Sequence, residues 1–166
     1  MGDIIRDFDP SDWDAVNSIY KQGIETNLAT FQTSCPAYAE WDNSHLAFCR
    51  FVYEQDGVVV GWAALSPVSS RCVYSGVAEL SIYIAGSARA SGIGTKLLNK
   101  TIEESRTHGI WTLQSGIISD NSASIRLHLK CGFREVGYRE KIARNAEGEW
   151  KNTVMMERRS SYGLSE

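Results

Sequence analysis

Hydrophobic residues follow two different spacings along this chain, and the two spacings predict strands that alternate with helices. The stretch 77–84, VAELSIYI, is almost wholly apolar and rich in β-branched side chains, which is typical of a buried strand. The stretch from about 92 to 108 instead places Ile93, Leu97 and Leu98 at helical spacing, with charged residues on the opposite side. The sequence therefore predicts a buried strand followed closely by an amphipathic helix.

The segments around this pair predict further strands and helices. Strands over 48–54 and 58–65 flank Asp56-Gly57, a dipeptide typical of tight hairpin turns. Ser11 is placed to cap a first helix, because acidic residues suited to a first helical turn follow it. The remaining predicted elements are a strand over 3–8, a helix over about 37–45, and strands over 112–118, 133–141 and 153–157.

The segment between about 121 and 132 fits both kinds of element. Its apolar residues alternate as in a strand, and the same residues also form pairs four positions apart, as on a helix. Ser122 is a possible N-cap, and Gly132 is suited to end a helix. We interpret this segment as a helix.

The order of these elements predicts the fold class. A hairpin followed by strand, helix, strand, helix and strand indicates a mixed α/β domain, in which strands joined by a crossover helix are parallel. A length of 166 residues suits one domain spanning 1–166, with a core over about residues 4–158.

The composition narrows the class of function. A net charge of −3 gives no field that would attract nucleic acid or an anionic membrane. No apolar run approaches the roughly 20 residues of a membrane span, and the N-terminal residues lack the apolar core of a signal peptide. The four cysteines are scattered along the chain. We therefore expect a cytoplasmic protein with reduced thiols in its core, no metal site, and no nucleic-acid or membrane partner.

A glycine-rich turn, Arg89-Ala90-Ser91-Gly92-Ile93-Gly94-Thr95, links the buried strand to the amphipathic helix. Free N–H groups at a helix N-terminus attract anions, and glycines at 92 and 94 let a phosphate approach the backbone. The turn lacks the GxxxxGK[ST] pattern of a P-loop, and Leu97 stands where a dinucleotide fingerprint has glycine or alanine. Either the turn binds phosphate, or its glycines serve the geometry of the helix start alone.

This turn and a downstream segment together resemble the GNAT acetyltransferase family. Arg89-x-x-Gly92-x-Gly94 is similar to the family's R/Q-x-x-G-x-G/A motif. One strand later, residues 121–133 are similar to its N-x-x-[SA]-x-x-L-[YH]-x-x-x-G-F segment. The resemblance covers roughly residues 4–156 and is greatest to the phosphinothricin acetyltransferase-like branch. The stretches that carry this finer resemblance are AELSIYI (78–84), TFQ (30–32) and GEWKN (148–152).

The resemblance implies a fold, a co-substrate and an assembly. The GNAT fold is a twisted, mixed and mostly antiparallel sheet with a splayed parallel strand pair, flanked by helices. The co-substrate is acetyl-CoA, whose pantetheine arm lies along the central strand, and members of this branch often form homodimers. Ala90 and Ser91 depart from the usual Gly and Lys or Arg, which removes a cation from the phosphate turn. The residues assigned to acetyl-CoA are Ile82, Tyr83, Ile84, Arg89, Ala90, Ser91, Gly92, Ile93, Gly94, Thr95, Asn121 and Ser124.

Two titratable residues are candidates for the chemistry of acetyl transfer. Glu79 is a carboxylate within an apolar strand, and its burial should make it a stronger base. By resemblance it accepts the proton of the amine through a water molecule; alternatively, a structural arginine or backbone amides neutralise it. His128 stands where many family members carry a tyrosine that protonates the departing thiolate, a task that imidazole suits near neutral pH. Alternatively, His128 is a partly exposed helix residue without a chemical role.

The amine that accepts the acetyl group is expected to be a small, amino-acid-like molecule. Phosphinothricin, methionine sulfoximine and methionine sulfone are the substrates that the resemblance implies, acetylated by direct attack in a ternary complex. Arg71 either pairs with an acidic group of the acceptor or is a surface charge. The alternatives are a protein N-terminus or lysine, a polyamine or an aminoglycoside as acceptor, and a non-catalytic acyl-CoA-binding module. The candidate acceptor contacts are Phe31, Arg71, Tyr74 and Trp150.

Overall fold

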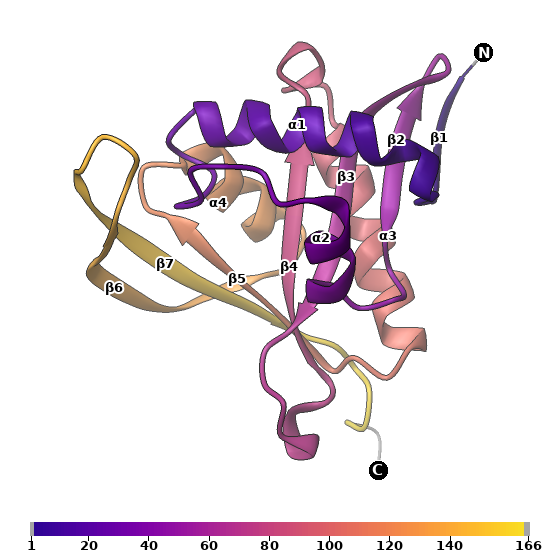
Figure 1. Ribbon diagram of the computed structural model, residues 1–166. Helices are drawn as coiled ribbons and strands as arrows, with labels where there is room; N and C mark the ends of the chain where they lie inside the picture. Colours follow the sequence, from indigo (N-terminus) through magenta and orange to yellow (C-terminus); the bar gives the residue numbers. More distant parts are fainter. Residues whose placement is uncertain (1, 165–166) are drawn as a thin grey trace.

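The computed structural model describes residues 2–164 and contains a seven-stranded sheet with helices on both faces (Figure 1). The strand order is β1-β2-β3-β4-β5-β7-β6. Among these strands, β4 and β5 form a parallel pair, and the other neighbouring strands are antiparallel. The predicted mixed fold is therefore confirmed. The strands are β1 (Asp3–Asp7), β2 (Phe51–Gln55), β3 (Val58–Pro67), β4 (Val77–Ile84), β5 (Thr112–Ile118), β6 (Arg134–Arg144) and β7 (Trp150–Arg159).

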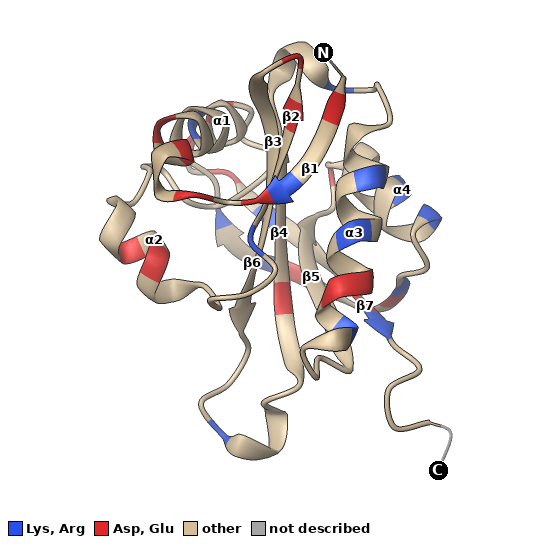
Figure 2. Cartoon of the chain, turned by 90° about the vertical axis from the view of Figure 1, so that its right-hand side faces the viewer, with Lys and Arg blue, Asp and Glu red and all other residues tan. Residues whose placement is uncertain are grey.

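The helices form two layers, with α1 and α2 on one side of the sheet and α3 and α4 on the other (Figure 2). The helices are α1 (Trp13–Glu25), α2 (Tyr38–Ser44), α3 (Ile93–Thr107) and α4 (Ser122–Lys130), with short 3-10 turns η1 (Pro10–Asp12), η2 (Cys72–Tyr74) and η3 (Gly86–Ala88). Helix α1 packs on β3 and β4, whereas α3 packs on β2, β3 and β4. The ambiguous segment is thus a helix, α4, as interpreted from the sequence.

Both predicted serine caps are wrong, because an earlier residue caps each helical segment. Ser11 lies inside η1, and the side chain of Asp9 accepts its backbone N–H at 2.9 Å. In return, the side chain of Asp12 accepts the N–H of Asp9 at 2.8 Å, which completes a capping box. Ser122 is the first residue of α4, and the N-cap is Asn121, whose Oδ1 accepts the N–H of the third helical residue.

Stacked aromatic rings fix the position of β4 against α1. The ring centroids of Tyr20 and Tyr83 lie 5.0 Å apart, and Trp62 of β3 stacks on Tyr83 at the same distance. Gly23 makes this approach possible, because a Cβ there would lie 2.7 Å from the ring of Tyr83. The side chain of Tyr83 is therefore held between the helix and the neighbouring strand.

The parallel pair β4 and β5 is hydrogen-bonded only near its start. The paired residues are Val77 with Thr112, Ala78 with Leu113, and Glu79 with Gln114. Beyond them, β4 continues to Ile84 and β5 to Ile118, and the two strands diverge (Figure 1). The splayed parallel pair implied by the resemblance is therefore present.

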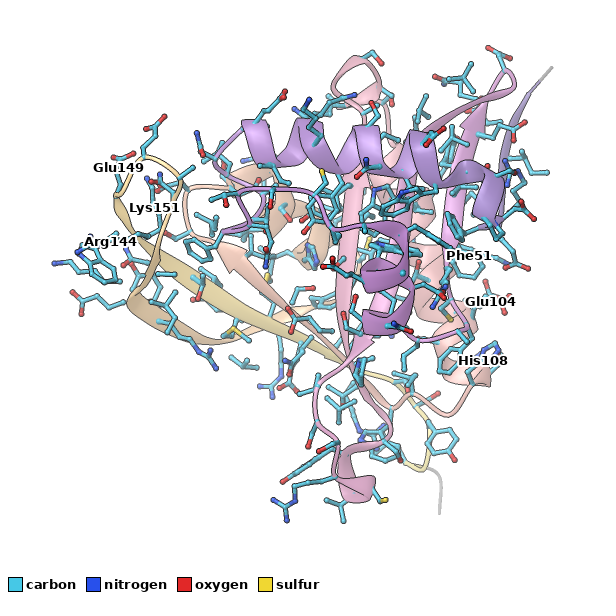
Figure 3. All side chains as sticks on the ribbon, viewed as in Figure 1. Phe51, Glu104, His108, Arg144, Glu149 and Lys151 are labelled. Atoms are coloured by element: carbon cyan, nitrogen blue, oxygen red, sulfur yellow. The ribbon has the colours of Figure 1, made fainter. Side chains whose placement is uncertain are left out.

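The last two strands form a longer hairpin than the sequence predicts. Strand β6 extends to Arg144 and β7 begins at Trp150, so both reach past the predicted bounds. Asn152 supports this extension, because its Oδ1 accepts the N–H of Lys141 at 2.7 Å where the strand register shifts. Arg144 and Lys151 lie towards the outer end of the hairpin (Figure 3). Strand β6 forms one edge of the sheet and is mostly exposed.

The cysteines are free thiols in different surroundings. Cys49 and Cys131 are buried, Cys35 is half-buried and Cys72 is exposed on η2, so the predicted core location is wrong for Cys72. Within residues 2–164, no group of three or more His, Cys, Asp or Glu side chains is placed to share a metal ion. No helix of the same residues has the length and hydrophobicity needed to cross a bilayer.

Candidate active site

The glycine-rich turn presents the N-terminus of α3. Gly92 is the N-cap of α3 and has a φ of +82°, in the left-handed region that favours glycine. No atom lies within 4 Å of a Cβ built there, so the backbone angle and not the available space calls for glycine. Ala90 also has a positive φ, +60°, which costs a residue with a Cβ about 1–2 kcal/mol. The first N–H groups of α3 have no partners within the helix and are free to bind an anion.

A cavity of about 550 Å³ lies at this turn, between β4 and α4. Every residue that the resemblance assigns to acetyl-CoA lines it, with the exception of Ser91. The hydroxyl of Ser91 is instead directed inside the turn and donates to the carbonyl oxygen of Ala88. We call this space the cofactor cavity.

Arg126 of α4 lines the cofactor cavity and was not predicted. It adds a second guanidinium to that of Arg89 in the lining of this cavity. The sequence offered no signal for it, because the face predicted to contact the cofactor carries Asn121 and Ser124, and a residue two positions after Ser124 points to the other side of an ideal helix.

A second cavity of about 350 Å³ adjoins the first where β4 and β5 separate. Its walls include Leu80 and Ser81 of β4 and Ser115 of β5, together with Thr30 and Phe31 of the connection between α1 and α2. We call it the acceptor cavity. The residues that line both cavities are Ala29, Ile82, Tyr83, Asn121 and Ser124.

Of the four predicted acceptor contacts, the structure places only Phe31 in the acceptor cavity. Arg71 and Tyr74 are exposed at η2, where the guanidinium lies 5.6 Å from the ring centroid of Tyr74. Trp150 is 52% exposed at the start of β7 and packs against Arg144, whose guanidinium is 4.4 Å from the ring. Arg71, Tyr74 and Trp150 therefore make their contacts outside both cavities, the first two with each other and the third with Arg144.

Glu79 lines the acceptor cavity at the last paired position of β4. The predicted burial is wrong: Glu79 is exposed, because the strands separate beside it and open the cavity. None of the ion pairs within residues 2–164 involves Glu79, so no arginine of that part of the chain neutralises it. It is the one carboxylate side chain among the described residues that line this cavity.

His128 of α4 also lines the acceptor cavity and is a buried residue. Its side chain is 2% exposed, so the alternative of a partly exposed histidine is wrong. Nδ1 lies 2.7 Å from the carbonyl oxygen of Ser124, and Nε2 lies 3.0 Å from Oγ of Ser115. Burial lowers the pKa of His128, and the bond to Ser124 offsets this only in part.

Tyr20, Thr30 and Ser115 line the acceptor cavity and were not predicted. Burial raises the pKa of both Tyr20 and Tyr83, so the two phenols stay neutral at the wall of the cavity. The sequence offered no local signal for Tyr20 and Ser115, because long-range contacts bring α1 and β5 to one cavity. Thr30, in contrast, lies in the TFQ stretch that carries the resemblance.

The chain belongs to the GNAT family of acetyltransferases. Residues 13–133 match the family described as Acetyltransferase (GNAT) family. The protein is thus an N-acetyltransferase that uses acetyl-CoA.

Several relatives cover almost the whole chain. The L-methionine sulfoximine/L-methionine sulfone acetyltransferase of Salmonella typhimurium is 28% identical over 92% of both chains. The phosphinothricin N-acetyltransferase of Alcaligenes faecalis is 30% identical, covering 96% of this chain and 82% of its own. A crystal structure of a GNAT superfamily phosphinothricin acetyltransferase from Sinorhizobium meliloti in complex with acetyl-CoA superimposes with a TM-score of 0.90, at 27% identity, over 100% of this chain and 92% of that one.

The buried His128 should make the folded protein less stable in mild acid. Since its pKa is lowered in the folded state, the unfolded chain binds a proton below about pH 6.5 that the folded protein does not. The free energy of unfolding should therefore fall as the pH drops below this value, by at most about 1.4 kcal/mol per pH unit for this group. Urea unfolding between about pH 7 and pH 5 measures the slope, which His128→Phe should flatten. An equal slope in the variant would contradict the prediction.

Proposed function

We propose that the protein acetylates the primary amine of a small, amino-acid-like substrate, with Glu79 as the general base. The observation that carries the proposal is that two cavities meet where β4 and β5 separate, with Glu79 in the wall of the second.

The four free cysteines suit a reducing compartment, so we also propose a cytoplasmic location. Recovery of the native protein from a secreted fraction would contradict the location alone.

The residues divide the work of a direct transfer in a ternary complex. Acetyl-CoA supplies the acetyl group as a thioester, held by the start of α3, Arg89 and Arg126, with its arm along Ile82–Ile84. The amine arrives from the acceptor cavity and attacks the carbonyl carbon. Glu79, through a water molecule, takes the proton that the nitrogen must lose as the C–N bond forms and the C–S bond breaks.

The size and lining of the acceptor cavity favour a small amine. Its volume of about 350 Å³ is at the lower end of ligand pockets, which suits a molecule of amino-acid size better than an aminoglycoside. The neutral rings of Tyr20, Phe31 and Tyr83 supply apolar walls for the substrate. The names of the relatives point to phosphinothricin, methionine sulfoximine and methionine sulfone as the first substrates to test.

Release of the CoA thiol in the presence of acetyl-CoA and a panel of amines tests the reaction. We expect turnover with the three amino-acid analogues, and a loss of about 10²- to 10⁴-fold in kcat for Glu79→Gln, because the amide cannot accept the proton. Glu103→Gln is the matched control, since Glu103 is exposed on α3 and lines neither cavity. Absence of turnover with every amine, or full activity of Glu79→Gln, would contradict the proposal.

Truncation of Phe31 and of Arg71 should separate a cavity contact from a surface charge. Phe31→Ala removes a wall of the acceptor cavity and should raise the KM of the amine about tenfold or more, as expected for the loss of a buried aromatic contact. Arg71→Ala should leave this KM unchanged, because Arg71 lines neither cavity. A raised KM in Arg71→Ala would instead return Arg71 to acceptor recognition.

We further propose that a second copy of the chain covers strand β6. This strand is a sheet edge with exposed Val136, Tyr138 and Ile142, and an uncovered apolar edge invites pairing. Sedimentation at micromolar concentration should therefore report a homodimer, and Tyr138→Lys should shift it to monomer. Ile4→Lys, on the exposed β1 edge, should not change the mass. A monomeric parent protein would rule the dimer out.

A further inference from the structure

The hydrogen bonds of His128 determine where its proton lies. A carbonyl oxygen only accepts hydrogen bonds, so the 2.7 Å contact with the Ser124 carbonyl requires a proton on Nδ1. The ring is 2% exposed, and burial disfavours its charged form, so it carries that one proton and no other. Nε2 is then a bare acceptor.

The bare Nε2 in turn sets the direction of the Ser115 hydroxyl. Oγ of Ser115 lies 3.0 Å from Nε2 and must donate its hydrogen there. A serine hydroxyl has one hydrogen and two lone pairs, so Ser115 has only lone pairs left to offer to the acceptor cavity. Ser115 therefore faces the cavity as a hydrogen-bond acceptor.

Ser115 and Glu79 flank the separation of the strands from two sides. Glu79 pairs with Gln114, so the side chain of the next residue, Ser115, belongs to the opposite face of the sheet. Both residues nevertheless line the acceptor cavity, because the strands part at this point. Ser115 and His128 line the acceptor cavity but not the cofactor cavity. This placement favours a contact of Ser115 with the amine over a contact with acetyl-CoA.

We propose that Ser115 Oγ accepts an N–H of the attacking amine, and that His128 is the positioning residue that holds this hydroxyl as an acceptor. A primary amine attacks with its lone pair directed at the thioester carbon, so its two N–H groups need acceptors to either side. The water molecule held by Glu79 accepts one N–H group, and Ser115 Oγ accepts the other. In this arrangement Nε2 of His128 carries no proton that it could give to the departing thiolate. The positioning role therefore replaces the role of proton donor that the sequence led us to expect for His128. The inference rests on the proposed acetylation of a small primary amine.

A double-mutant cycle between Ser115 and His128 tests the proposal. Ser115→Ala removes the acceptor, and His128→Phe keeps a ring against Phe133 while freeing the hydroxyl to rotate. Each should lower kcat/KM for the amine about tenfold, the value of one hydrogen bond, with an unchanged KM for acetyl-CoA. The double variant should be no worse than Ser115→Ala, because His128 acts only through Ser115. Ser122→Ala, exposed on α4 and outside both cavities, is the control and should match the parent protein.

Losses that multiply in the double variant would overturn the proposal, since His128 would then act on its own. A raised KM for acetyl-CoA in Ser115→Ala would also overturn it, by assigning Ser115 to the co-substrate. The tautomer is an independent readout: ¹H–¹⁵N spectra of the parent protein should show the proton of His128 on Nδ1, and a proton on Nε2 would refute the inference even if His128→Phe does not fold. Failure of the proposed function is distinct, because it appears as an inactive parent protein with the Nδ1 tautomer intact.

Discussion

The end of hydrogen bonding between β4 and β5 is the constraint on which the site depends. Pairing stops at Glu79 and Gln114, and from there one backbone edge of β4 is free to receive the amides of an extended ligand. The same separation exposes Glu79 and admits Ser115 from the other face of the sheet. If β4 and β5 stayed paired along their whole length, the carboxylate of Glu79 would be buried and the two cavities would not be connected.

The elements of the fold could be predicted from the sequence because they depend on local patterns. The apolar run of β4, the amphipathic spacing of α3 and the hairpin turn at 56–57 each fix an element within a few residues. The caps were misplaced because serine, asparagine and aspartate compete for that position, and the choice depends on which side chain reaches the right N–H. The separation of β4 and β5 is a property of pairing between distant segments, which only the family resemblance implied.

The two cavities of the site also differ in how far the sequence predicts their lining residues. Motif spacing predicts the residues of the cofactor cavity that lie on β4, in most of the glycine-rich turn and at Asn121 and Ser124. It does not predict those contributed by α1 and the connection after it, such as Gly23 and Ala29. The acceptor cavity is assembled from α1, the connection after it, β4, β5 and α4. The stretches that carry the resemblance contain its residues from the connection, β4 and α4, but not Tyr20 of α1 or Ser115 of β5. Arg71 precedes the central strand and Trp150 lies in the resembling GEWKN stretch, yet both lie at the surface, where Arg71 packs on Tyr74 and Trp150 on Arg144. Position along the chain does not predict their place, because long-range contacts decide which segments meet at the acceptor cavity.

Asn121 makes two hydrogen bonds of opposite direction, and only one of them could also be made by aspartate, another residue that commonly caps helices. Its Oδ1 caps α4, a role that aspartate or serine would fill equally well. Its Nδ2 also donates to the carbonyl oxygen of Leu28 at 3.3 Å, which joins the helix start to the connection that roofs the acceptor cavity. A carboxylate has no hydrogen to give and would repel that carbonyl, so the choice of asparagine here reflects a need for opposite polarities at the two ends of a single side chain.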